Sequence, residues 1–335
     1  MKKLDTAVTG YLNDFYPFFD KFVDELLKNG NAELREIFRY HLGLDDPAEK
    51  RGKHIRSLLT LICCDGTGAN WHNSLPAAAA IELIHNFSLI HDDIEDDGDL
   101  RRGKATVWKK WGVPKALNAG DAMFVSAFLA LSELRGKVDD VIALDASLLL
   151  NKTCFELTSG QQMDIGFENR ERISEEEYLE MIAGKTAALI ACSTQMGALI
   201  GGHTEEDQVT FADFGRSLGV AFQIYDDWLG VWGDPDSTGK TATGDIIERK
   251  KSLPVLLGLE KSERFSERYS ENEVTPQMAE TLAAWLREDG VEAEVKQRYA
   301  KWSTKALTTI DELHCSGPCK ETLTGLTNKL LIRTK

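Results

Sequence analysis

The sequence contains little proline, no long apolar run and no regular set of cysteines. Only 8 of its 335 residues are proline, and no linker rich in Ser, Pro or Gly divides it, so we expect a single domain over residues 1–335. No uncharged run reaches the roughly 18 apolar residues of a membrane span, and no signal-peptide apolar segment begins the chain. The six cysteines show no zinc-ligand spacing, and we expect a reducing, cytoplasmic location.

The chain also lacks an excess of basic residues, because its formal net charge is −15. Proteins that bind nucleic acid need basic surfaces, so this charge argues against a nucleic-acid partner. Alternating strand patterns bounded by hairpin turns are rare, whereas nearly every long segment repeats its apolar residues at helical spacing. The sequence therefore predicts an all-α fold.

Capping and turn residues predict several helix boundaries. Ser74-Leu-Pro76 predicts the start of a long helix that ends at Asp97. Ser174 and Glu177 form a capping-box pattern, and the helix that they begin is expected to continue through Lys185. The remaining expectations are a helix from about Thr210, a loop over Gly233–Asp245 that folds over ligand as a lid, and a solvated connection over Lys261–Glu273.

Two of the hydrophobic helical stretches end in paired aspartates, Asp92-Asp93 followed by Asp96, and Asp226-Asp227. A helix sets residues four apart on one face, so Asp92 and Asp96 are expected to point the same way. Mg²⁺ commonly takes one or two carboxylates and completes its shell with substrate phosphates. Two such acid clusters facing one another predict a site for a metal-bound diphosphate, and hence an enzyme.

Basic residues accompany both acid pairs. Lys53 and Arg56 are three apart on one helix face, Arg101-Arg102 follow the first acid pair, and His85 shares a helical stripe with its aspartates. A guanidinium group matches phosphate oxygens bidentately. Each basic pair alone is commonly a solvated surface, but their joint occurrence around two acid pairs is far more specific. Further basic residues follow at Lys185, Lys240, Lys250 and Lys251.

The combined motifs resemble those of the trans-isoprenyl diphosphate synthases, or polyprenyl synthetases, from about Gly52 to the C-terminus. Asp92-Asp93-Ile-Glu-Asp96 matches the first aspartate-rich motif of this family, and Leu-Arg-Arg-Gly follows it at Leu100–Gly103. Phe222–Asp227 matches the second motif, and the segments around Lys53 and Lys185 match in order and spacing. This resemblance implies a single large helical bundle of the isoprenoid synthase type with a central active-site cavity, and a homodimer.

The resemblance also implies a role for each matched residue. Mg²⁺, with three ions per active site when substrate is bound, is expected on the aspartates, with Asp93 and Asp227 assisting the others. The metal ligands are expected to be Asp92, Asp93, Asp96, Asp226 and Asp227. The allylic diphosphate is expected to be bound by Arg101, Lys185, Thr186, Gln223, Lys240 and Lys250, and isopentenyl diphosphate by Lys53, Arg56, His85 and Arg102. The residues expected to be catalytic are Asp92, Asp96, Lys185, Thr186, Gln223 and Asp226.

The chain departs from the family pattern at three positions within or beside these motifs. His54 stands where the family usually has Arg, and Ser57 where it usually has Pro, which leaves one cation fewer at the isopentenyl site. Gly230 occupies the last acidic position of the second motif, and Asp234, one helical turn further on, is expected to compensate in part if the helix persists. Metal binding by the second motif is the property that Gly230 is expected to affect.

The reaction that the resemblance implies is the condensation of isopentenyl diphosphate with an allylic diphosphate. Ser88 is small and Phe87 aromatic just before the first motif, which suggests geranylgeranyl diphosphate, a C20 product; Met123 and Phe124 are further candidates for the wall that limits the product. The alternative interpretation, that Phe87 is an ordinary core residue with no effect on product length, has nearly equal weight. The alternatives are a farnesyl diphosphate (C15) synthase, a class I terpene cyclase and a non-catalytic regulatory subunit.

Overall fold

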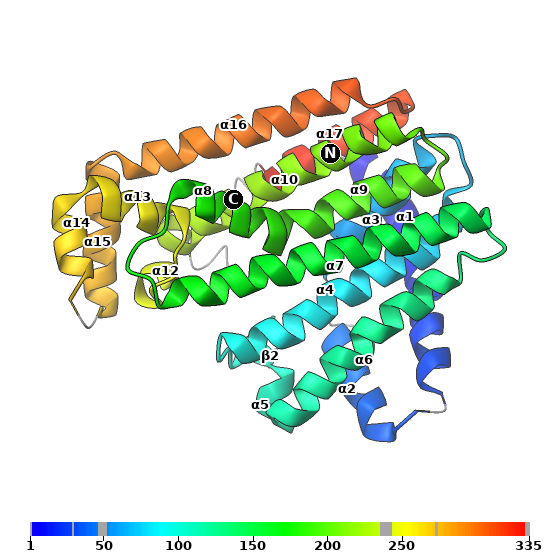
Figure 1. Ribbon diagram of the computed structural model, residues 1–335, viewed down its shortest axis with the longest axis horizontal. Helices are drawn as coiled ribbons and strands as arrows, with labels where there is room; N and C mark the ends of the chain where they lie inside the picture. The colour runs from blue at the N-terminus through cyan, green and yellow to red at the C-terminus, as the bar shows by residue number, and fades with distance from the viewer. Residues whose placement is uncertain (1, 29, 46–51, 235–242, 272–273, 332–335) are drawn as a thin grey trace. The chain divides into compact units, whose positions relative to one another are not determined.

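The computed structural model describes residues 2–28, 30–45, 52–234, 243–271 and 274–331 (Figure 1). Nearly all of these residues lie in helices, joined by short loops and one two-stranded hairpin, which confirms the all-α fold. Within them, no helix is long and apolar enough to cross a membrane. The chain divides into two compact units. The single domain expected from the sequence stays a prediction. Unit 1 comprises Met1–Cys154, Cys192–Ala212 and Leu313–Gly325, and unit 2 comprises Phe155–Ala191, Asp213–Glu312 and Leu326–Lys335.

Unit 1 is built around helix α4 (Leu75–Glu95), which carries the first acid pair at its end. The expected start is confirmed: Pro76 lies in the first turn, although the Ser74 hydroxyl donates to Trp71 O in the preceding 3₁₀ turn and does not cap the helix. Helix α6 runs beside α4 (Figure 1). The other elements with residues in unit 1 are α1 (Lys2–Leu27), α2 (Ala32–Leu42), α3 (Ile55–Asp65), η1 (Trp71–Ser74), β1 (Leu100–Arg101), β2 (Lys104–Ala105), α5 (Val107–Trp111), α6 (Val113–Ser132), α7 (Asp140–Glu168), α9 (Ala188–Ile200), α10 (Glu205–Trp232) and α17 (Gly317–Leu331).

Unit 2 holds the second acid pair, near the end of α10. Its helix α8 (Glu175–Ile182) begins with the expected capping box, in which Ser174 and Glu177 exchange side-chain and backbone hydrogen bonds. The helix then continues, as expected, through the π turn η2 (Ala183–Ala187) into α9. The remaining elements of unit 2 are α12 (Gly244–Ile247), α13 (Leu253–Lys261), α14 (Glu263–Tyr269), α15 (Pro276–Glu288) and α16 (Val291–Glu312).

One expected helix start and one expected loop are wrong. Helix α10 begins at Glu205 and not near Thr210, because the Thr204 hydroxyl accepts a hydrogen bond from Asp207 N and caps the first turn. The expected solvated connection contains α14, whose Phe265 and Tyr269 are buried in the core of unit 2. Residues 235–242 of the expected lid, among them Lys240, lie outside the described residues, so its closure stays a prediction.

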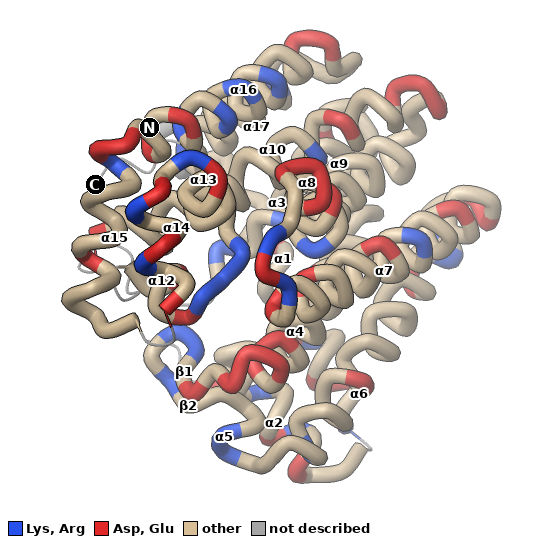
Figure 2. Tube along the Cα trace, turned by 60° about the vertical axis from the view of Figure 1, so that its left-hand side comes forward, with Lys and Arg blue, Asp and Glu red and all other residues tan. Residues whose placement is uncertain are grey.

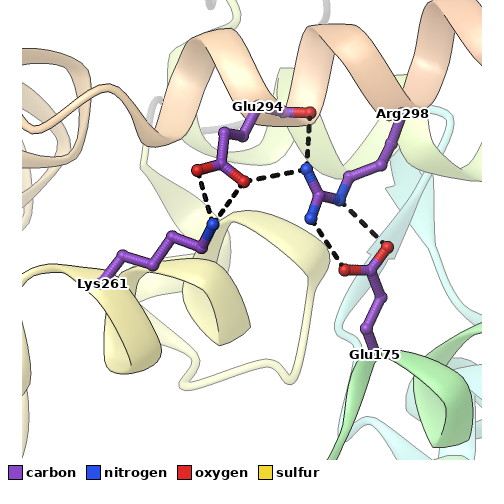
Figure 3. A network of polar contacts seen from close by, with 4 residues as sticks. All are labelled: Glu175, Lys261, Glu294 and Arg298. Carbon is purple, nitrogen blue, oxygen red and sulfur yellow. Dashed lines mark hydrogen bonds and ion pairs between the residues drawn. The ribbon is translucent and has the colours of Figure 1, made fainter.

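An ion network joins three helices of unit 2 (Figure 3). Lys261 of α13 lies 2.6 Å from both carboxylate oxygens of Glu294 on α16. Arg298, one turn further along α16, donates to Glu294 at 2.9 Å and reaches Glu175 of α8 through Nε and Nη2 at 3.0 and 2.9 Å. The two acids and two cations alternate, so that each charge has a neighbour of opposite sign.

Candidate active site

The first acid pair lies in the last turn of α4. Asp96 caps the helix, and its N–H still donates to Asp92 O at 2.9 Å, so the helical path continues through it. Asp92 is half-buried and Asp96 is exposed. Helix α4 itself ends at Glu95 and not at Asp97, and a shared face for these two aspartates stays a prediction. In Figure 2 the acidic end of α4 lies beside the basic hairpin β1–β2.

Asp93, between them, has a different environment. Its carboxylate is buried and is held by Arg101 of β1, whose Nε lies 2.8 and 2.9 Å from the two oxygens and whose Nη2 lies 2.7 Å from Oδ1. Burial raises the pKa of Asp93, and the Arg101 guanidinium opposes part of that rise. Arg101 thus ties the hairpin to the acid pair, and its expected role as a diphosphate ligand stays a prediction.

The residues expected to bind isopentenyl diphosphate gather in unit 1. Arg56 Nη1 lies 3.3 Å from His85 Nε2. Burial and the charge of Arg56 lower the pKa of His85 well below its usual value, so the imidazole is neutral and accepts this hydrogen bond. The guanidinium of Arg102 lies over Gly52, where a Cβ atom would be 3.2 Å from Nη2, and the adjacent Lys53 is exposed. The structure therefore brings Arg56, His85 and Arg102 together, and these three residues form the basic cluster.

Beneath the basic cluster lies a buried carboxylate, Glu82 of α4, that the sequence analysis did not single out. Ser57 Oγ donates to Glu82 Oε2 at 3.0 Å, and Asn86 Nδ2 donates to Oε1 at 3.1 Å. His54 Nδ1 lies 3.1 Å from Oε1. Burial alone would raise the pKa of Glu82, but His54, His85 and Ser57 outweigh it and lower that pKa. The sequence did carry a signal for this buried carboxylate, because Glu82 is the one charged residue in the apolar run of residues 77–84.

In the second acid pair, the aspartates also differ. Asp227 is buried and accepts three hydrogen bonds: from Tyr178 Oη at 2.7 Å, Gln223 Nε2 at 2.8 Å and Leu253 N at 3.0 Å. Burial, and then the charge of Asp245, raise the pKa of Asp227 to about 7 in spite of these donors. Asp226, its neighbour, is only half-buried. Asp227 therefore organises its surroundings, and Asp226 is the more accessible carboxylate.

Lys185 and Thr186 lie in the π turn η2, a distortion that is frequent at functional sites. Glycines allow it to touch α7, because a Cβ atom at Gly160 would lie 2.2 Å from Lys185 N. This approach places Lys185 Nζ 2.5 Å from Asp164 Oδ2, a partner that the sequence analysis missed. Thr186 Oγ1 donates to Gln223 Oε1 at 2.7 Å, which joins η2 to α10, and the expected role of both residues as substrate ligands stays a prediction.

Gly230 leaves room for another acid of unit 2. A Cβ atom at Gly230 would lie 2.4 Å from the carboxylate carbon of Asp245, so the Asp245 carboxylate rests directly on the glycine. The expectation for Asp234 is not met, because α10 ends at Trp232 and Asp234 lies beyond it. Asp245, from α12, is therefore the acid beside the position where the motif departs from its family. Lys250, a predicted substrate ligand, is exposed and pairs with Glu248 at 3.0 Å.

The residues expected to set product length lie on the facing sides of α4 and α6. Phe87 is buried, and its ring centroid lies 5.1 Å from that of Phe124. Met123 is fully buried, and Ser88 is half-buried with its hydroxyl donating to His85 O at 2.8 Å. The structure thus places an aromatic pair from two helices next to the first acid motif.

Comparison with known proteins identifies the family. The family model described as polyprenyl synthetase matches residues 35–286. The chain belongs to this family. It is 37% identical over 271 residues to the geranylgeranyl diphosphate synthase of Methanosarcina mazei, covering 81% of each chain. It is 41% identical over 231 residues to a (2E,6E)-farnesyl diphosphate synthase of Mycobacterium tuberculosis, covering 67% of this chain and 63% of that protein.

Solved structures agree with this assignment. The crystal structure of a polyprenyl synthetase from Streptomyces coelicolor A3(2) matches with a TM-score of 0.89 and 34% identity, covering 98% of this chain and 99% of that chain. The family resemblance inferred from the motifs is confirmed, and the chain described here is a prenyltransferase enzyme. Among the described residues of this chain, no group of three or more His, Cys, Asp or Glu side chains is placed to hold a metal ion.

Proposed function

We propose that this polyprenyl synthetase condenses isopentenyl diphosphate with an allylic diphosphate to make geranylgeranyl diphosphate. The observation that carries the proposal is the basic cluster of Arg56, His85 and Arg102 in the same unit as the first acid motif. An enzyme that only ionises one diphosphate needs no second phosphate site, whereas a condensing enzyme needs two. The relatives named as geranylgeranyl and farnesyl diphosphate synthases support the same reaction class.

We propose Asp92, Asp96 and Asp226 as the Mg²⁺ ligands. They fit the ion because each is an accessible or half-buried carboxylate, and Mg²⁺ takes one or two such groups along with phosphate oxygens. Asp93 and Asp227 are buried and bound by protein donors, so we assign them to orienting their neighbours. Bound Mg²⁺ would neutralise charge on the departing diphosphate. Three ions per site stays a prediction.

The chain's own residues act on the same leaving group. As the allylic C–O bond breaks, its electron pair leaves with the diphosphate oxygen, and Lys185 and Lys250 are proposed to stabilise the charge that develops there. Gln223 and Thr186 hold each other and keep η2 in place. The double bond of isopentenyl diphosphate then attacks the allylic cation, a new C–C bond forms, and a proton is lost to the released diphosphate.

We propose that Phe87 and Phe124 end the path of the growing chain, which supports a C20 product. Phe87 is a large buried side chain shortly before the aspartates of the first motif, and its ring meets the Phe124 ring of α6 in a T-shaped pair. Ser88 beside it is small and leaves the direct path beneath Asp92 open. Farnesyl diphosphate is the alternative product.

The experiment that tests the proposal is mass analysis of products from isopentenyl diphosphate with C5, C10 and C15 allylic diphosphates. We expect C20 products that require Mg²⁺ and that disappear with EDTA and in D92N and D226N variants. Products from one allylic diphosphate alone would indicate a terpene cyclase. No turnover with any partner would indicate a regulatory subunit.

We propose a homodimer as the assembly, as the family resemblance implies. Exposed apolar side chains recur at helical spacing along α6 (Leu117, Val125 and Leu129, 42–56% exposed) and along the first part of α7 (Val141, Leu144 and Leu148, 48–69% exposed). Apolar surface of this kind is typical of a protein interface, and a second copy of the chain is the partner that we propose. The cytoplasmic location stays a prediction.

A further inference from the structure

The two departures in the isopentenyl segment, His54 and Ser57, both contact Glu82. They flank Arg56 in the sequence, at the start of α3, and both reach the same carboxylate on α4. A buried carboxylate is costly unless donors and positive charge surround it. Glu82 accepts hydrogen bonds from Ser57 and Asn86, and the His54 imidazole lies 3.1 Å from it. The segment that carries the basic side chains is thus fastened to α4 on both sides of Arg56.

Backbone conformation gives a second reason for this fastening. His54 adopts φ of 46°, in the left-handed region that costs energy for a residue with a side chain. Such a conformation persists where surrounding contacts hold it. Here the imidazole is enclosed by Glu82 and by the rings of Phe15 and Tyr16, at centroid distances of 5.7 and 5.2 Å. Without Glu82, one of the three groups that hold His54 is lost.

Charge links the same carboxylate to the substrate-binding cation. Arg56 is half-buried, and burial lowers the pKa of its guanidinium, whereas the negative charge of Glu82 raises it. Three positions along α4, His85 accepts the hydrogen bond from Arg56. Glu82 therefore supports Arg56 in two ways: it balances the half-buried charge, and it holds residues 54 and 57 on either side.

We propose that Glu82 is a positioning residue for isopentenyl diphosphate, acting through His54 and Ser57 to hold Arg56 in its binding orientation. The inference rests on the proposed function, because it takes Arg56 and His85 as ligands of that substrate. It further assigns a purpose to the two departures: in place of a family cation and a proline, this chain has two polar side chains that contact one acid, Ser57 by a hydrogen bond and His54 at 3.1 Å.

Direct binding and steady-state kinetics of the full chain test the proposal. Glu82→Gln keeps the shape but removes the charge, and we expect about tenfold weaker calorimetric binding of isopentenyl diphosphate alone. Its KM for isopentenyl diphosphate is expected to rise to the same extent, with the KM for the allylic diphosphate within about twofold of wild type. Ser57→Ala should shift the same constants less, and Glu133→Gln, at the exposed residue that follows α6, should leave them unchanged.

The outcomes separate this inference from the proposed function. If wild type binds isopentenyl diphosphate and Glu82→Gln binds it equally well, Glu82 has no positioning role, but the proposed function stands. A variant that unfolds at lower temperature and changes both KM values equally would show a structural role only and would overturn the proposal. A wild-type enzyme that binds no isopentenyl diphosphate would overturn both.

Discussion

Single side chains at the two acid pairs divide between those that are accessible and those that other protein groups hold in place. In each acid pair, the second aspartate is buried and bound by protein donors, whereas the first is half-buried. Asp93 is paired with Arg101, and Asp227 with Tyr178 and Gln223. We therefore propose two purposes for a doubled aspartate, with one carboxylate for the metal ion and one that fixes the turn carrying it.

Phe87 provides a test of product length. Phe87→Ala removes the ring that packs on Phe124 and leaves space beneath the first motif, so the product is expected to lengthen beyond C20. Mass analysis of the prenyl products after dephosphorylation measures this. Phe155→Ala is the matched control, because Phe155 is 77% exposed and no change in product is expected there. If Phe87→Ala makes products of unchanged chain length, Phe87 is an ordinary core residue and does not limit the product.

Gly230 provides a second test at this scale. A methyl group in Gly230→Ala would lie 2.4 Å from the Asp245 carboxylate, which must move away from the second motif. Since small displacements in a catalytic site are costly, we expect kcat to fall by roughly ten- to a hundredfold. Gly244→Ala is the control, because a Cβ atom there meets nothing within 4 Å. Wild-type turnover in Gly230→Ala would show that the position of Asp245 does not matter.

At the scale of helices, capping residues decided which expectations succeeded. The capping box at Ser174 is confirmed, and the start of α10 would have been found from Thr204 and Asp207 by the same rule. Helix α14 was missed because its charged residues dominate the segment, although Phe265 and Tyr269, four apart, mark an apolar face. Partners distant in the sequence, such as Asp164 for Lys185, depend on packing between helices and could not be predicted from one segment.

The network of α8, α13 and α16 in unit 2 allows a prediction for stability. Arg298→Met keeps the apolar stem but removes the charge that joins Glu175 to Glu294. These ion pairs are half-buried and still reach solvent, where single pairs contribute little. We expect a loss of about 1 kcal/mol in the free energy of unfolding, smaller at high salt. Urea denaturation at low and high salt measures it. Lys301→Met, at an exposed position on the same helix, is the control. Equal losses in the two variants would show that the network contributes nothing.

Across the whole chain, total charge and local charge have opposite signs where substrate is proposed to bind. The formal net charge is −15, yet Arg56, Arg101 and Arg102 all lower the pKa of His85. Exposed charges further away than about 8 Å are screened at physiological ionic strength, so a diphosphate responds chiefly to the nearby cations. An acidic protein can therefore bind anionic substrates through a small basic cluster, and composition alone would not have located it.

The proposed homodimer gives the prediction at this scale. Replacing Leu129 of α6 and Leu144 of α7 together by Lys places two charges within apolar stripes that are 47% and 61% exposed at these residues. Burying an unpaired charge in an interface is costly, so the variant is expected to be monomeric at concentrations where wild type is dimeric. Light scattering after size-exclusion chromatography measures the mass. Glu133→Lys, also exposed on the chain between these stripes, is expected to leave the dimer intact. A dimeric double variant would mean that these stripes are not the interface, and a monomeric wild type would exclude the homodimer itself.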